Sequence, residues 1–131
     1  MLAELDNCLL TRSQICCVSL AAITQSELPR LLNIASSDPS ARPALIVTSL
    51  MLPQKPEPSL FSLSLAKAAQ RNQVLGLHRA FHSKGVHIGV VNVGGYVTET
   101  HGTLNPTNIA NKTWEWLEQA KDKSTFEVQV L

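Results

Sequence analysis

Two histidines in one segment, His78 and His82, are the first residues whose types and spacing suggest chemistry. Imidazoles four residues apart lie on one face of a helix, and that spacing is compatible with zinc binding. Arg79 stands where the zinc-protease pattern His-Glu-x-x-His has its glutamate, and no third ligand is close in the sequence. A solvated helix face therefore explains the pair better than a metal site does.

The three cysteines, Cys8, Cys16 and Cys17, are clustered near the beginning of the chain. An odd, clustered count with no downstream partner is not a disulfide framework, which favours a reducing compartment and predicts a cytoplasmic location. Neighbouring residues of a helix point about 100° apart, so Cys16 and Cys17 cannot chelate a metal as a pair. We interpret them as small core residues.

All six glycines lie between Gly76 and Gly102, so the first 75 residues contain none. A phosphate-binding loop needs glycine, because its backbone must approach the phosphates closely and adopt positive φ. The N-terminal half therefore has neither a P-loop nor a Gly-x-Gly-x-x-Gly motif, and the later glycines form neither pattern.

Composition and length predict one folded domain over residues 1–131, because 44% of the residues are hydrophobic and 16% are charged. A formal charge of +1 gives no field strong enough to hold nucleic acid or an anionic membrane. The first residues carry two acids and no base, which makes a poor signal peptide. The longest apolar stretch, Ile15–Ile23, is broken by Ser19 and is shorter than the about 20 residues that span a bilayer.

Three helices are expected. Apolar residues almost all round predict a buried helix over Asp6–Ile34, with Pro29 kinking or ending its first part. A helical apolar period predicts a second helix over Leu60–Lys84, with Ser59 as its N-cap and Gly85 as a left-handed C-cap. The third begins with a capping asparagine followed by proline and is expected to run over residues 106–121.

Three strands alternate with these helices. Apolar runs predict buried strands at Ala44–Ser49 and Val86–Val93, and period-two alternation predicts a closing strand at Thr125–Val130. Gly94-Gly95 is expected to end the second strand in a turn with unusual dihedral angles. The alternation of helix and strand indicates an α/β fold with crossovers between parallel strands and no second domain.

Three consecutive segments carry a family resemblance. The strand Ile46-Val-Thr-Ser49, the helical Leu63-Ser-Leu-Ala-Lys67-Ala-Ala and the stretch Gly85-Val-His-Ile-Gly-Val-Val-Asn-Val-Gly94-Gly95-Tyr-Val-Thr98 follow one another. Their order and spacing resemble the catalytic-side half of a short-chain dehydrogenase/reductase, in which Tyr-x-x-x-Lys lies on the helix and a Pro-Gly turn precedes a threonine. The resemblance covers nearly the whole chain but only the C-terminal half of the family's domain. It implies the C-terminal part of a Rossmann-like doubly wound sheet, with three parallel strands and flanking helices.

What the resemblance implies chemically is hydride transfer between NAD or NADP and a small carbonyl or alcohol compound. In the family a tyrosine hydroxyl exchanges the proton, and the lysine one helical turn later lowers its pKa and holds the ribose hydroxyls. Lys67 takes the lysine position here, but Leu63 takes the tyrosine position, and leucine cannot transfer a proton. A divergent branch, seen in fungi and bacteria, has a similar Leu-Ser-x-x-Lys-Ala-Ala, and the chain resembles a truncated member of it.

The residues that the resemblance implies for the site each have a plainer interpretation. Lys67 would hold the ribose, or is equally well an ordinary surface lysine. Ser49 lies one place from the family's serine position and would polarise a carbonyl; we prefer a strand-end hydroxyl that bonds neighbouring backbone. Gly94, Gly95 and Thr98 would contact the nicotinamide end, although turn geometry and capping explain them better.

The family's glycine-rich turn and first strands have no counterpart in this chain. The resemblance therefore implies that the strand Ala44–Ser49 has a free edge, and a free apolar edge favours pairing with another chain. The helices Asp6–Ile34 and Leu60–Lys84 resemble the pair that forms the family's dimer face. We expect self-association or pairing with a related chain.

Three functions stay open from the sequence. The first is a member or fragment of an NAD(P)-dependent oxidoreductase family, impaired as an isolated catalyst because the phosphate-binding loop and the proton donor are absent. The second is a non-catalytic chain that completes the sheet of a full-length relative or dimerises with it. The third is an incomplete gene product with no independent function, so whether the chain is an enzyme is left undecided.

Overall fold

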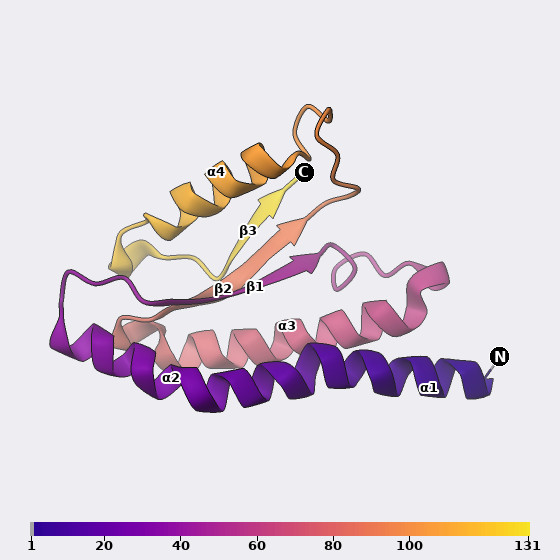
Figure 1. The fold of residues 1–131 in the computed structure, drawn as a ribbon, viewed down its shortest axis with the longest axis horizontal. Coiled ribbons are helices and arrows are strands. Elements are labelled where there is room, and N and C mark those ends of the chain that lie inside the picture. Colours follow the sequence, from indigo (N-terminus) through magenta and orange to yellow (C-terminus); the bar gives the residue numbers. More distant parts are fainter. Residues whose placement is uncertain (1) are drawn as a thin grey trace.

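A computed structural model describes residues 2–131, with side chains from residue 8 onward. It consists of one parallel sheet in the order β1-β2-β3, whose strands alternate with helices along the chain (Figure 1). The elements are α1 (Leu2–Ser13), α2 (Ser19–Ser37), β1 (Ala44–Leu50), α3 (Phe61–Phe81), β2 (His87–Val93), α4 (Pro106–Leu117) and β3 (Glu127–Val130). The expected α/β class with three parallel strands and flanking helices is confirmed.

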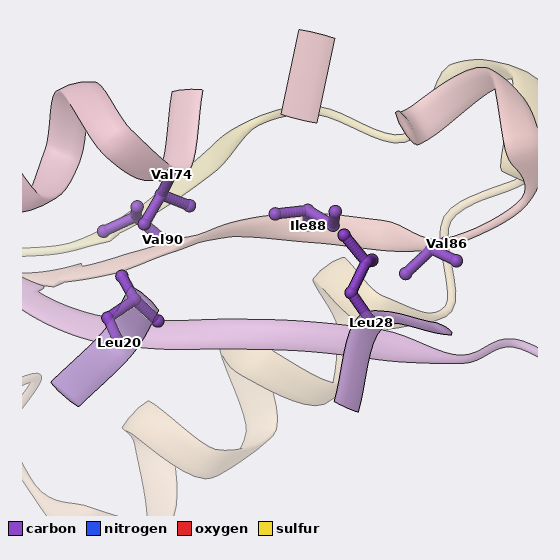
Figure 2. Packing of buried hydrophobic residues seen from close by; sticks show 6 residues of the cluster. All are labelled: Leu20, Leu28, Val74, Val86, Ile88 and Val90. Atoms are coloured by element: carbon purple, nitrogen blue, oxygen red, sulfur yellow. The ribbon is translucent and has the colours of Figure 1, made fainter. Parts of the chain in front are cut away.

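The sheet separates two apolar cores. In Figure 1, α1, α2 and α3 lie along one face and α4 along the other. Residues of β2 point alternately to the two faces, so Ile88 and Val90 enter one core while Val91 and Val93 enter the other. Figure 2 shows the first core, which is made by Leu20, Leu28, Val74, Val86, Ile88 and Val90. Burial on both faces explains why the central strand is an apolar run without alternation.

The register makes β2 the central strand. β1 pairs with β2 from Ala44 opposite His87 to Leu50 opposite Val93. β3 pairs with the other side of β2 from Val90 opposite Glu127 onward. Within the described residues, the outer edge of β1 therefore has no neighbouring strand.

The N-terminal segment is a continuous helical rod. α1 continues through a π-helical turn at Gln14–Val18 into α2. The observed helix therefore extends beyond both ends of the predicted Asp6–Ile34. Pro29 does not end the helix, because it lies inside α2, which continues to Ser37. The alternative expectation, a kink at Pro29, stays a prediction. Neighbouring Leu28 is buried in the core, and this packing holds the turn despite the lost backbone donor.

Residues Cys8–Ser37 of this rod are long and apolar enough to cross a membrane by length and composition, which the expectation based on Ile15–Ile23 missed. A core helix passes the same test, and Leu20 and Leu28 do lie in the core. Only 22% of the apolar window is buried inside the described fold.

Both ends of α3 are tightened by 3-10 turns. The first turn, Pro58–Leu60, is capped by the Glu57 carboxylate, which accepts from the backbone N–H of Ser59 at 3.5 Å and from its hydroxyl at 3.2 Å. The predicted cap at Ser59 is therefore wrong by two residues. Gly85 follows the last turn with φ of 87°, which confirms the predicted left-handed cap.

α4 begins as predicted, because the Asn105 side chain accepts from the backbone N–H of Asn108 at 2.8 Å and Pro106 follows it. It ends at Leu117 instead of continuing to about residue 121. The guanidinium of Arg42 donates to the carbonyl oxygens of Glu118 at 2.7 Å and Gln119 at 3.1 Å, which satisfies acceptors at the end of the helix.

Trp116 packs inward and Trp114 outward, as two residues two apart on a helix must. Trp116 is 3% exposed and Trp114 is 63% exposed. The Trp116 indole N–H donates to the hydroxyl of Thr125 at 2.9 Å, and its ring lies against the backbone of Gly89. This contact joins α4 to the middle of β2.

Candidate functional site

A cleft of about 410 Å³ lies beyond the carboxyl ends of β1 and β2. It is lined by Leu50, Met51, Leu52, Lys55, Glu57, Leu60, Val93, Gly94, Gly95 and Tyr96. Ligands of open α/β sheets bind at the carboxyl ends of the strands, and the volume lies within the range of small-molecule sites. The cleft is therefore the candidate site.

Gly94 and Gly95 form one wall of the cleft, so the structure brings both of these expected site residues to it. The Gly94 N–H donates to the Val130 carbonyl at 2.8 Å. A Cβ at Gly94 would lie 2.7 Å from the Cδ2 atom of Leu131, and one at Gly95 would lie 3.0 Å from the Cδ1 atom of Leu104. The expectation of unusual dihedral angles is wrong, since neither glycine has positive φ. Close approach of neighbouring segments is what requires small residues here.

Thr98 lies outside the lining of the cleft, on an exposed loop. Its backbone N–H donates to the Leu104 carbonyl at 3.0 Å, and its carbonyl accepts from the His101 N–H at 3.3 Å. Both bonds close the loop between β2 and α4. Contact between Thr98 and a nicotinamide stays a prediction.

Lys67 occupies the seam between α3 and β1 and is half-buried. Its ammonium donates to Gln70 Oε1 at 3.0 Å and to the Thr48 carbonyl at 3.3 Å. Gln70 is held in turn by its own bond to the Cys16 carbonyl at 2.6 Å. These bonds orient Lys67 toward the end of β1, and its third N–H has no partner among the described residues. Its role in holding a ribose stays a prediction.

Ser49 is 4% exposed, and its hydroxyl has no hydrogen-bond partner within the described residues. The preferred interpretation, a hydroxyl that bonds neighbouring backbone, is therefore wrong. Ser49 stands opposite Asn92 of β2, whose Oδ1 atom is also buried without a partner. Two unpaired oxygens therefore lie at one level of the sheet, one residue before Leu50 and Val93 of the cleft lining.

Sequence reasoning missed the cluster that surrounds this point. Asn92 Nδ2 donates to Glu127 of β3 at 2.9 Å, and Arg71 of α3 donates to the same carboxylate at 3.1 and 3.2 Å. The guanidinium also lies 5.1 Å from the centre of the Phe126 ring. One signal was present in the sequence, since Asn92 is the single amide in a mostly apolar strand.

Leu63 occupies the position at which the resemblance implies a tyrosine, and its side chain has no proton to exchange. Leu63 is half-buried one turn before Lys67. Ser62 and Ser64 point to different sides of α3, as expected, because Ser62 donates to the Cys8 thiol at 3.3 Å and Ser64 accepts from the Glu57 N–H at 3.4 Å. Both hydroxyls are buried, since α3 is covered on two sides.

His78 is half-buried, so the interpretation of this pair as a solvated face is wrong for one member. Its Nδ1 atom lies 2.8 Å from the Ile88 carbonyl, and its ring stacks on that of His82 with centres 4.8 Å apart. Over residues 8–131, no three or more His, Cys, Asp and Glu side chains are grouped so that they could hold a metal ion.

The three cysteines are free thiols with different surroundings. Hydrogen bonds from Ser62 and Arg12 lower the pKa of the exposed Cys8 thiol below its usual value. Cys16 is buried, as expected of a core residue, whereas Cys17 is only half-buried. Burial raises the pKa of the Cys17 thiol.

Comparison with known proteins supports the fold and no more. No protein-family model matches the chain, and no curated protein matches it. Among solved structures it is similar to a short-chain dehydrogenase from Rhodopseudomonas palustris, with a TM-score of 0.74 and 15% identity. The match covers 96% of this chain and 52% of that chain, so this chain spans about half the length of its structural relative. The chain therefore has a short-chain-dehydrogenase-like fold.

Proposed function

We propose that the chain provides the substrate side of an NAD(P)-dependent oxidoreductase of the short-chain dehydrogenase type, and derives from the divergent branch that has leucine in place of tyrosine. Its ligand would be a small carbonyl or alcohol compound bound in the cleft beyond β1 and β2. The observation that carries the proposal is the orientation of Lys67, whose ammonium reaches the Thr48 carbonyl at the end of β1. In the proposed role the third N–H of this ammonium bonds a ribose hydroxyl of the nucleotide.

The same proposal assigns the chain little hydride transfer of its own. Leu63 offers no proton at the position where the related family has tyrosine. The first 75 residues contain no glycine, so no phosphate-binding loop is available there. Binding of a dinucleotide would rest on the nicotinamide end alone. We expect dissociation constants near 1 mM, which correspond to a binding free energy of about −4 kcal/mol.

Nuclear magnetic resonance titration with NADH and NADPH tests this proposal. We expect saturable shifts of the amide resonances of Gly94 and Gly95, and a severalfold weaker response in Lys67→Met. The matched control is Lys112→Met, which removes an exposed ammonium from α4. Absence of saturable shifts at the two glycines, or equal affinities in both variants, would overturn the proposal.

A second candidate function is non-catalytic pairing with a related chain, favoured by the outer edge of β1, which has no neighbouring strand among the described residues. A strand edge of seven mostly apolar residues can pair with a further strand through its unpaired backbone groups. A hollow of about 520 Å³, lined by Arg42, Ala44, Trp114, Leu117 and Glu118, includes the start of this strand and the end of α4. Exposed apolar side chains on the other side of the sheet, among them Leu10, Ile15, Val18, Phe61 and Leu65, favour a second interface.

Light scattering during gel filtration tests this second function. A dimer or larger species at micromolar concentration supports it, and a clean monomer removes self-association. Co-purification with a full-length relative would support completion of the sheet of that relative. Loss of co-purification in Thr48→Lys, which changes an exposed side chain of β1, would locate the contact at the strand edge.

We also propose a cytosolic location, because all three cysteines are free thiols and thiols stay reduced there. Fractionation of cells that express the full chain tests it. Recovery in the membrane fraction would overturn it and would give the apolar surface of Cys8–Ser37 a different role.

A further inference from the structure

The cleft has an aliphatic floor and one charged wall. Leu50, Leu52 and Val93 contribute only hydrocarbon, and Met51 adds a flexible thioether. Tyr96, the one aromatic residue of the lining, is 94% exposed at the rim and offers no enclosed surface for stacking. Such a lining suits a flexible alkyl chain better than a flat ring.

Lys55 and Glu57 are the charged residues of the lining, and they differ in what they already bind. The Glu57 carboxylate accepts from the backbone N–H and the hydroxyl of Ser59, so it is engaged in capping the turn before α3. The ammonium of Lys55 forms no ion pair and no hydrogen bond with any residue that the structure describes. The backbone is nevertheless fixed, because the Lys55 N–H donates to the Met51 carbonyl at 2.8 Å.

We propose that the cleft binds an aliphatic carboxylic acid, with its alkyl chain on the floor and its carboxylate on the ammonium of Lys55. The inference rests on the proposed function and names its substrate class, an aliphatic acid bearing the carbonyl or hydroxyl group. A carboxylate matches the free charge at the wall, and a charge-assisted hydrogen bond would form where the ammonium now meets solvent. Aliphatic burial predicts that affinity rises about fourfold for each added methylene until the cleft is full.

Met51 gives a direct readout of this binding. The chain has two methionines, so a sample labelled with ¹³C in the methionine methyl groups gives two signals, and Met51→Leu assigns the one in the cleft. We would titrate the protein with hexanoate, octanoate and decanoate. Two control compounds have a similar alkyl chain. Octan-1-ol carries no charge, and octyltrimethylammonium carries the charge opposite to that of octanoate.

We expect octanoate to shift the Met51 signal saturably and to bind several-fold more tightly than octan-1-ol. Octyltrimethylammonium should bind more weakly than the alcohol. Lys55→Met should weaken octanoate about tenfold and leave the alcohol unchanged, whereas Lys112→Met should change neither. Lys55 is exposed on a turn, so the substitution should leave the circular dichroism spectrum of the fold intact.

Three outcomes would overturn the inference: no saturable shift with any acid, equal octanoate affinity in Lys55→Met, or tighter binding of the alkylammonium. The nucleotide titration at Gly94 and Gly95 is a separate measurement. Octanoate binding without a nucleotide response would retain the aliphatic site and overturn the oxidoreductase role. A nucleotide response without octanoate binding would retain the oxidoreductase role and overturn the aliphatic site.

Discussion

Gly89 is the position where one added methyl group should damage this fold most. Gly89 lies in β2 with Trp116 against its backbone. A Cβ there would lie 2.7 Å from Cη2 and 2.8 Å from Cζ2 of that indole, and it would also collide with the Phe126 carbonyl oxygen. The indole can shift only by weakening its 2.9 Å bond to Thr125.

The carbonyl oxygen cannot give way either, because it accepts from the Val90 N–H at 2.9 Å and thereby joins β3 to β2. Overpacking of a core usually costs about 1–3 kcal/mol, and an immovable backbone atom places Gly89→Ala at the upper end, about 3 kcal/mol. A domain of this size is stable by about 5–15 kcal/mol in total. The variant should therefore fold, but with a clearly lower urea midpoint.

Gly76→Ala is the matched control, since it adds the same atom inside α3 where nothing lies within 4 Å. It should stabilise the chain by about 0.4–1 kcal/mol, because alanine restricts the unfolded state and favours helix. Urea denaturation followed by circular dichroism measures both free energies of unfolding. Equal free energies for the wild type and Gly89→Ala would refute the packing described for Trp116.

Two further predictions concern titratable side chains. Burial lowers the pKa of His87 below its ordinary value, so the unfolded chain binds this proton more readily. Stability should accordingly decrease as pH falls below about 6.5. The urea midpoint of the wild type should be lower at pH 5.5 than at pH 7.5. His87→Gln should reduce this difference, whereas the control His82→Gln, at an exposed position, should leave it unchanged. A hydrogen bond from Ser62 lowers the pKa of Cys8, so iodoacetamide should alkylate Cys8 faster than the buried Cys16 at pH 7. Ser62→Ala should slow that alkylation as measured by peptide mass spectrometry, and an unchanged rate would contradict the assigned cause.

Patterns that depend on local residues predicted most of the elements. The apolar run before Gly94 gave the central strand, and Asn105 followed by Pro106 gave the start of α4 to the residue. Gly85 gave the end of the second helical segment, because a left-handed cap depends on a single residue. These features depend on neighbouring residues in the sequence and not on contacts with distant segments.

Features that arise from distant contacts could not be predicted in this way. The carbonyls that follow α4 are bonded by Arg42, far away in the chain, so local residues did not indicate an end at Leu117. The orientation of Lys67 depends on Gln70, which is itself held by the backbone of the π-helical turn. For the candidate site, the resemblance implied contact of Gly94 and Gly95 with the nicotinamide end, which stays a prediction, while the aliphatic part of the cleft lining followed only from the packed structure.

The parallel sheet also determines the order of events when the chain is made. Among the described residues, β1 gains its strand neighbour only after β2 has been made, because Ala44 pairs with His87. A ribosome adds about 5–20 residues per second, so the intervening forty or so residues take about 2 to 8 seconds. For that interval β1 lacks the neighbour that it has in the described sheet. Folding should consequently be slow, with late closure of the sheet, since non-local pairing of parallel strands is slow to form.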